Sequence, residues 1–433
     1  MSYPKDNLKI LGRMFKNHRT RKGYSLRGLS RAISIVHPVI SDIENRKVTP
    51  NIDTLELLFN AVDVPFHTDE EQLLERRRSI DSFYEALYYR NARSIQMHYR
   101  ALKRHAGELL RSPLRVEYLL VLEAYRIMVK GNYSAAVLRD LEDFYEHLSH
   151  TQRQIFNTLR GIAFFYRNIY VEAAYYFNLS KDTVENRYFH ALSLSYLAFA
   201  YDAVFKNYQS LKNAERASRS HQRLDNVERK IQVDILTVKK HIDLGNTEEG
   251  SHLLQHIRQT LNGNEDLMQI FSDKVKLQLA YAAYVNQALS WTKYHLGRVR
   301  RKTPKILFYE GIIACHLGEK ERMRKTLEAM ESHKSHPEYN LYYSASRLCH
   351  YYAGEIEENL DSEAETVLDS IHHIPHLHVR YFTFALLFYY YQMEEECSKA
   401  YATAKLHFFQ SVDRDMHESD CKPEPLKGIL KHL

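Results

Sequence analysis

The sequence has little of the two residues that interrupt helices. It contains 14 Gly and 10 Pro among 433 residues. No alternation of apolar and polar residues runs for long, so the period of a half-buried strand is missing. Hydrophobic residues make up 44% of the chain, which is enough for a buried core and excludes disorder. Few helix breakers, no strand pattern and a sufficient core together predict an all-α protein.

Cysteine is also scarce, at 4 residues, and no two of them form a C-x-x-C pair. Cys315, Cys349 and Cys397 lie in helical patterns, and Cys421 lies near the end of the sequence. This spacing predicts free thiols in a reducing compartment rather than a disulfide framework. The sequence also lacks an N-terminal signal pattern and an apolar run of membrane-spanning length. We therefore expect a cytoplasmic protein without a membrane segment.

The motifs of common enzyme classes are missing. The sequence has no glycine-rich phosphate loop, no dinucleotide-binding fingerprint, no H-E-x-x-H and no G-x-S-x-G. We therefore expect no enzyme activity and no cofactor. The one cluster of metal-ligand type is His372, His373, His376 and His378. We interpret it as a polar loop between helices, with metal binding as the less favoured alternative, and expect no metal.

What the sequence does contain is a recurring helical turn. The turns are marked by Asn91, Asn132, Asn168, Asn207, Asn246 and Asn286, at steps of 36 to 41 residues, and they continue at Gly318 and Gly354. A single helix pair cannot bury its apolar face alone, so pairs that repeat with such a period are expected to stack. We therefore predict an α-solenoid of about eight or nine helix pairs.

The positive charge of the chain is concentrated at its front. Residues 1–66 contain eleven Lys and Arg but six Asp and Glu, so they supply most of the overall net charge of +6. A compact basic module of this kind is typical of a nucleic-acid-binding domain. Helical spacing predicts short helices over residues 6–22, 26–33, 37–45 and 52–62, with a tight turn before the third.

This module resembles the Xre/Cro-type helix-turn-helix repressors. The matching residues are Ser25, Leu26, Leu29 and Ser30, then Ile40, Ser41, Ile43, Glu44 and Asn45, and finally Pro50. Two residues depart from the pattern, because Ser34 and Arg46 stand where that family commonly has glycine. The resemblance implies that the third helix enters the major groove, and that Arg19 and Glu44 form a structural ion pair.

The resemblance also implies which residues meet DNA. Base edges or their surroundings would be contacted by His37, Val39, Asp42 and Asn45, and phosphates by Arg27, Ser41, Arg46 and Lys47. Phosphate contacts position such a domain and base contacts select the sequence. Val39 could instead pack inside the module, so its base contact stays open.

The turns resemble those of tetratricopeptide repeats, most clearly at Gly131, Asn132 and Tyr133 with Ala136. If the repeat frame of that family carries over, the residues that line the inner groove include Gln154, Asn157, Ser193, Tyr196, Gln232, Lys239, Arg380 and Thr383. Amides can pair with a peptide backbone, and cations with a terminal carboxylate. A hydrated groove without a ligand is the alternative.

The whole layout resembles the RRNPP family of peptide-sensing regulators, and arbitrium receptors within it. The resemblance implies a cytoplasmic homodimer that binds a double-stranded DNA operator and a short signalling peptide, in quorum sensing or in a phage or mobile-element decision. The expected segments are a DNA-binding domain (1–66), a linker helix with the start of the first repeat (67–92), a peptide-binding and dimerising solenoid (93–412) and a polar tail (413–433). The alternative is an interaction adaptor, or a repressor controlled by an antirepressor protein, with no small peptide ligand.

Overall fold

The computed structural model of the chain describes residues 5–393, 399 and 403. Regular structure in this part of the chain is entirely helical, as the sequence predicted. The expected polar tail lies outside the described residues, as do Cys397 and Cys421. No helix in the described part combines the length and the apolar character that a bilayer crossing requires.

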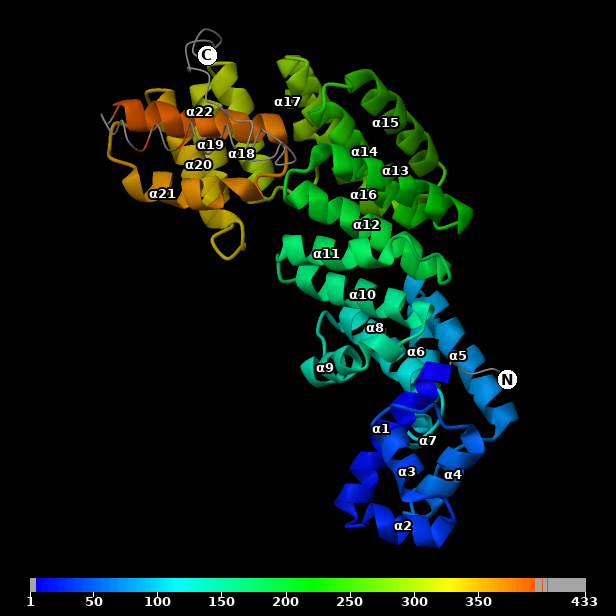
Figure 1. The fold of residues 1–433 in the computed structure, drawn as a ribbon. Coiled ribbons are helices and arrows are strands. Elements are labelled where there is room, and N and C mark those ends of the chain that lie inside the picture. Colours follow the sequence, from blue (N-terminus) through cyan, green and yellow to red (C-terminus); the bar gives the residue numbers. More distant parts are fainter. Residues whose placement is uncertain (1–4, 394–398, 400–402, 404–433) are drawn as a thin grey trace, which may run out of the picture. The chain divides into compact units, whose positions relative to one another are not determined.

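The predicted short helices of the basic module are present. They are α1 (Lys5–Arg21), α2 (Leu26–Ile33), α3 (His37–Glu44) and α4 (Ile52–Asn60), drawn in blue in Figure 1. Their core includes Phe15 and Phe59, which are fully buried and meet edge to face with centroids 5.5 Å apart. Burial of each such ring stabilises the fold by about 1.5–3 kcal/mol. A Cβ at Gly12 would lie 2.5 Å from the Ile43 carbonyl oxygen, so glycine lets α1 approach α3 closely.

Paired helices follow, as predicted. The pairs are α5 (Glu70–Tyr88) with α6 (Ala92–Arg104), α8 (Arg115–Lys130) with α9 (Ala135–Asp143), α10 (His150–Phe165) with α11 (Tyr170–Ser180), α12 (Arg187–Ala203) with α13 (Asn207–Arg223), α14 (Val227–Asp243) with α15 (Thr247–Asn262), α16 (Glu265–Val285) with α17 (Leu289–Gly297), α18 (Pro304–His316) with α19 (Lys320–Glu331), and α20 (Tyr339–Tyr352) with α21 (Asp361–Ser370). The short α7 (Ala106–Leu109), two 3₁₀ turns, η1 (Tyr145–His147) and η2 (Ile371–His373), and the helix α22 (Leu377–Met393) complete the described chain.

Each pair reverses through a residue in the left-handed region of backbone space. The residues are Arg90, Gly131, Asn168, Phe205, Gly245, Gln287, Gly318 and Gly354, with φ between 55° and 82°. A left-handed residue ends a helix and redirects the chain at the lowest cost when it is glycine or asparagine. The period visible in the sequence is therefore the period of this backbone turn.

The described chain forms two compact units. Unit 1 contains residues 1–200 and 216–230, and unit 2 contains residues 201–215 and 231–433. Long-range contacts close unit 1, since the Tyr88 hydroxyl lies 2.6 Å from His221 Nδ1 and Arg229 Nε donates to the Tyr88 carbonyl at 2.8 Å. Unit 2 is closed in a similar way, because the Arg380 guanidinium lies 3.6 Å from the centroid of the Phe205 ring.

Candidate functional site

The turn between α2 and α3 is built by local capping. Ser25 caps α2, and its hydroxyl accepts a hydrogen bond from the Gly28 backbone N–H at 3.0 Å. Ser34 ends α2 with φ at 56°, a left-handed conformation that costs a residue other than glycine about 1 kcal/mol. Pro38 lies in the first turn of α3, where the missing N–H has no helical partner to lose.

A buried ion pair fixes α3 against α1. Arg19 Nη2 donates to Glu44 Oε2 at 2.9 Å, and Arg19 Nε donates to the other carboxylate oxygen. Glu44 is 1% exposed. The hydrogen bond to Glu44 raises the pKa of Arg19. The structural ion pair that the resemblance implied is therefore present, and it orients the remaining face of α3.

That remaining face of α3 is open. His37, Val39 and Asn45 are exposed, and Ser41 and Asp42 are half-buried. Val39 therefore does not pack inside the module, although its contact with DNA stays a prediction.

Other groups hold this face in place. Asn45 accepts a hydrogen bond from Lys16 Nζ at 2.9 Å and donates to the Ser41 hydroxyl at 3.3 Å. Arg27 and Lys47 are exposed, and Lys47 Nζ lies 3.7 Å from Asp42. The face offers hydroxyl, amide, imidazole and cationic groups.

Arg46 has a different environment. It is half-buried in the left-handed region at φ 64°. Its Nη1 donates to the Asp143 carbonyl at 3.1 Å, and its guanidinium lies 5.5 Å from the centroid of the Phe144 ring. The loop after α3 is thus held by the end of α9, in the repeat part of unit 1. An expected phosphate contact by Arg46 would require these bonds to open.

In unit 1, most of the residues expected in the groove are buried and hydrogen-bonded within the chain. Gln154 is 1% exposed, accepts from the Asn186 N–H and donates to the Thr183 carbonyl. The hydroxyl of Ser193, which is fully buried, lies 2.8 Å from that of Thr158. These bonds join α10, α12 and the loop before α12. The structure gives both side chains a role in holding helices together.

Two expected groove residues in unit 1 keep some capacity for a ligand. Asn157 is 2% exposed; its amide N–H donates to the Tyr145 hydroxyl at 2.9 Å, and its Oδ1 has no partner in the described structure. Tyr196 is half-buried, and its hydroxyl lies 3.1 Å from that of Tyr166. Burial raises the pKa of Tyr196, so the phenol stays neutral.

Unit 2 contains a buried cluster of charges that the sequence prediction captured only in part. Lys239 Nζ lies 2.7 Å from Asp202 Oδ1, and Lys240 Nζ lies 2.6 Å from both Asp202 and Asp243. The charges at Lys239 and Lys240 lower the pKa of Asp202 although burial opposes them. Burial lowers the pKa of Lys239 to about 8. The signal in the sequence was Lys240 with Asp243, an i,i+3 pair on an otherwise apolar helix face.

Arg380 adds a third cation to this part of unit 2. It is 3% exposed, and its Nε and Nη2 both donate to the Ile374 carbonyl, at 3.0 and 2.6 Å. Burial lowers its pKa to about 10. Thr383 is fully buried and donates to the Val379 carbonyl, whereas Gln232 is half-buried. Peptide contact by these residues stays a prediction.

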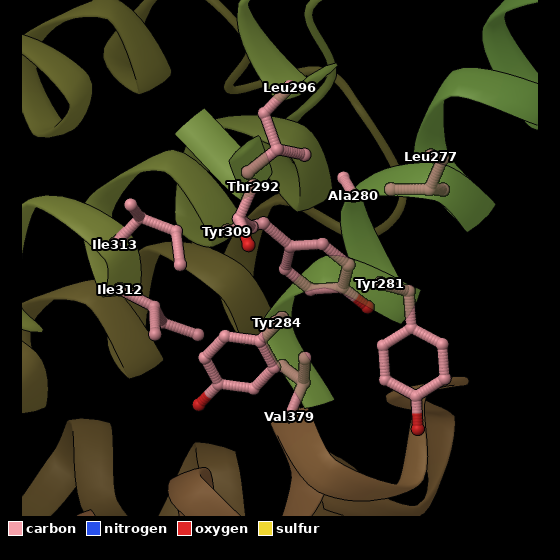
Figure 2. A pocket seen from close by; sticks show the side chains of 10 residues that line it. All are labelled: Leu277, Ala280, Tyr281, Tyr284, Thr292, Leu296, Tyr309, Ile312, Ile313 and Val379. Carbon is pink, nitrogen blue, oxygen red and sulfur yellow. The ribbon is translucent and has the colours of Figure 1, made fainter. Parts of the chain in front are cut away.

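Within the described part of the chain, no three His, Cys, Asp or Glu side chains are placed so that they could hold a metal ion together. His376 is buried, and its Nδ1 lies 2.8 Å from the Tyr309 hydroxyl. An adjacent apolar hollow is lined by Tyr281, Tyr284 and Tyr309 among others (Figure 2). Its volume of about 20 Å³ holds no more than about one water molecule. A hollow of this volume is too small for a peptide side chain.

No protein-family model matches the chain. Over 81 residues, or 18% of the chain, it is 35% identical to the HTH-type transcriptional regulator SinR of Bacillus subtilis (strain 168), and the match covers 73% of that protein.

Two solved structures are similar across most of the chain. One is the Rap protein complexed with Competence and Sporulation Factor, with a TM-score of 0.62 at 16% identity, covering 78% of this chain and 97% of that one. The other is the apo form of the quorum sensor NprR from B. thuringiensis, with a TM-score of 0.62 at 13% identity, covering 80% and 100%. At such identities the likeness shows the fold alone, and it confirms the predicted TPR-like repeats. The chain therefore belongs to the family of helix-turn-helix transcriptional regulators that includes SinR, and it joins that module to the helical-repeat fold of Rap and NprR.

Proposed function

We propose that this chain is a cytoplasmic transcriptional regulator that binds duplex DNA through α3 and changes its DNA affinity when a short signalling peptide binds the repeats. The observation that carries the proposal is the open face of α3, on a module related to SinR, with the helix anchored by the buried pair Arg19 and Glu44. Major-groove recognition requires a helix that is anchored on its core side and presents polar side chains on its exposed face.

The proposed DNA contacts divide into base contacts and phosphate contacts. His37, Asn45 and the half-buried Asp42 would meet base edges, together with the methyl groups of Val39. The phosphate contacts would come from Arg27, Ser41, Lys47 and, after release from α9, Arg46. Because the two kinds of contact come from different side chains, base selection and phosphate attraction can be separated by mutation.

The peptide part of the proposal is supported by likeness in fold. NprR has also been solved in complex with its cognate peptide NprX, and that structure matches with a TM-score of 0.59 at 14% identity, covering 78% of this chain and 99% of that one. In unit 1 we propose contacts with Asn157, whose Oδ1 has no partner in the described structure, and with Tyr196. Gln154 and Ser193 would contact the peptide only if their internal bonds open.

In unit 2 the proposed contacts are Gln232, Lys239, Arg380 and Thr383. The buried cations Lys239, Lys240 and Arg380 outnumber the two carboxylates, Asp202 and Asp243, that lie with them. A peptide carboxylate would balance this charge and could form a bidentate pair with the arginine. Because Lys239, Arg380 and Thr383 are buried, binding must replace hydrogen bonds and ion pairs within the chain by contacts with the peptide. The peptide would then have different affinities for two shapes of the unit.

Arg46 could couple a change in the shape of the repeats to DNA affinity. Its bond to the Asp143 carbonyl keeps a cation of the DNA-binding loop on the repeats. A peptide that shifts α9 would alter the fraction of molecules in which Arg46 is available for phosphate. We further propose that the regulator acts as a homodimer on a palindromic operator, since paired modules read paired half-sites.

The full chain tests the proposal. Duplexes selected from a random pool by the full chain supply the DNA probe, and short synthetic peptides with free or amidated C-termini supply the ligands. We expect a peptide that raises the melting temperature to change DNA affinity as well, and its amidated form to bind more weakly. Stabilisation only by a whole partner protein would instead support an adaptor or an antirepressor-controlled repressor.

A further inference from the structure

Two thiols meet in the repeats of unit 2, and the function proposed above does not use them. The described residues contain two cysteines, Cys315 near the end of α18 and Cys349 in α20, and both are free. Both side chains pack in the same apolar cluster. Their thiol groups are joined by a hydrogen bond. We call these two residues the thiol pair.

The register of the two helices explains why the thiols meet. Phe308 of α18 packs against Tyr342 of α20, with ring centroids 5.7 Å apart. Cys315 lies seven residues after Phe308, and Cys349 lies seven residues after Tyr342. The two contacts advance together, so α18 and α20 run parallel. Since seven residues are close to two helical turns, the thiol pair is the next contact of the same helix interface.

The two thiols differ in exposure. Cys349 is 2% exposed, whereas Cys315 is half-buried and is followed by the exposed His316. The Tyr284 hydroxyl lies 3.4 Å from His316 Nε2, beside the thiol pair. A small solute can therefore reach Cys315 from the surface, while Cys349 is shielded from solvent.

The hydrogen bond also makes the two thiols chemically unequal. Donation by the Cys349 thiol lowers the pKa of Cys315, although burial opposes it. The same hydrogen bond, and then burial, raise the pKa of Cys349. Because the thiolate is the nucleophilic form of cysteine, Cys315 is the better nucleophile of the pair.

We propose that the thiol pair is an oxidation site, at which hydrogen peroxide converts Cys315 and Cys349 into a reversible disulfide. The Cys315 thiolate attacks one peroxide oxygen and becomes a sulfenic acid, and the other oxygen leaves as hydroxide and takes up the proton that Cys315 has lost. The Cys349 sulfur then attacks the sulfenic sulfur, and the hydroxyl group leaves with the Cys349 proton as water. Two thiols are oxidised by two electrons, and one peroxide is reduced to two water molecules.

A bridge at this position would join two neighbouring repeats. It would close a loop from residue 315 to residue 349 and tie the end of α18 to α20. The two helices could then no longer slide or rotate past each other at this contact. Oxidation would therefore weaken a peptide response that needs such a movement. This consequence rests on the proposed function, whereas formation of the bridge does not.

Thiol counting on the full chain tests the bridge. Cys397→Ser with Cys421→Ser leaves the thiol pair as the only cysteines of the sequence. After treatment with hydrogen peroxide, the unfolded protein should show almost no free thiol, and its mass should fall by that of two hydrogen atoms. Peptide mapping should find residues 315 and 349 in one cross-linked fragment. Dithiothreitol should restore both thiols, since a disulfide is reducible whereas sulfinic and sulfonic acids are not.

Single substitutions in the same background separate the two roles. Cys349→Ala leaves Cys315 without a partner, so peroxide should produce a sulfenic acid that dimedone labels at residue 315. In Cys315→Ser, the buried Cys349 should keep its thiol under the same treatment. Oxidation should raise the melting temperature of the intact pair by about 5 °C or more and should leave that of Cys315→Ser unchanged.

The unsubstituted pair carries the main test, which therefore stays valid if Cys349→Ala folds poorly. A count that stays at two thiols per chain after peroxide treatment would overturn the proposal. So would a bridge that forms only between two chains on a non-reducing gel, since the thiols would then react with a second copy. None of these measurements involves DNA or peptide, so failure of the bridge and failure of the proposed function are distinguishable.

Discussion

Helix α3 of the basic module and the repeat helix α10 carry similar polar side chains but bury them differently. On α3, His37 and Asn45 are exposed, while Ile40 and Ile43 fill the core behind them. On α10, Gln154 and Asn157 are 1% and 2% exposed. Helix α3 lies at the surface of a small module and has one free face, whereas a helix inside a stack has neighbours on several sides.

This difference determines what a ligand must do at each place. DNA can contact the polar groups of α3 without breaking any bond within the core. A ligand at α10 or α14 must replace hydrogen bonds and ion pairs that now hold helices together, because a buried polar group without a partner costs about 1–3 kcal/mol. The basic module is therefore suited to DNA recognition without rearrangement. The repeats are suited to a change of shape when a ligand binds.

The largest effect is expected when the ion pair that anchors α3 to α1 is removed. Arg19→Ala leaves the Glu44 carboxylate buried without its partner, which should cost about 3–5 kcal/mol. We expect the basic module to unfold first, which thermal unfolding measures. We also expect DNA binding to be lost, which fluorescence anisotropy of labelled duplexes measures. Arg19→Met with Glu44→Leu removes both charges and should recover much of the stability. If Arg19→Ala leaves stability unchanged, the open face of α3 does not depend on this pair.

A somewhat smaller effect is expected in the repeats. Asp202→Asn leaves Lys239 and Lys240 facing each other in the core, at a cost of about 3 kcal/mol. Lys239 can relieve part of the repulsion by losing its proton, because its pKa is already lowered to about 8. Chemical denaturation measures the loss. The control is Lys325→Ala at an exposed pair with Glu321, which should change stability by less than about 0.5 kcal/mol.

The neutral contacts of unit 1 predict a dependence on pH. His221 lies between the Tyr88 and Ser195 hydroxyls, at 2.6 and 2.7 Å, and burial lowers its pKa from 6.5 to about 3. Between these values the unfolded chain binds a proton that the folded chain does not. Stability should therefore fall as pH decreases from 6.5, by up to about 1.4 kcal/mol per pH unit from this group. His221→Gln should lower stability at neutral pH but flatten the slope, and an unchanged slope would contradict this assignment.

The smallest expected effect concerns a single exposed cation. Lys47→Ala should weaken binding to every DNA sequence by a similar factor and should reduce the salt slope by about 1. Competition between selected and random duplexes measures this. A loss confined to one sequence would mean that Lys47 reads bases.

The helices of the basic module could be predicted closely from sequence, because the signals that define their ends and faces are local. The cap at Ser25, the apolar positions on α1 and the reversal at Ser34 each act within a few residues. The repeat period could be predicted for the same reason, since every turn has its own left-handed residue such as Asn168. Predicting the positions of these helices and turns required no information about distant partners.

The environment of the expected groove residues could not be predicted in the same way. Position relative to a turn indicates the helix face, but Gln154 is buried because the loop at Thr183 and Asn186 folds onto it. Arg380 is buried because Phe205, far away in sequence, lies under its guanidinium. Arg46 contacts α9 for a similar reason. Such partners are brought together only by the packing of the whole unit.

One measurement tests the central claim most directly: the affinity of the full chain for a selected duplex, across a series of salt concentrations, with and without a stabilising peptide. The account predicts that affinity falls steeply with salt and shifts when the peptide binds. Salt-insensitive binding, or a bound peptide that leaves DNA affinity unchanged, would contradict it.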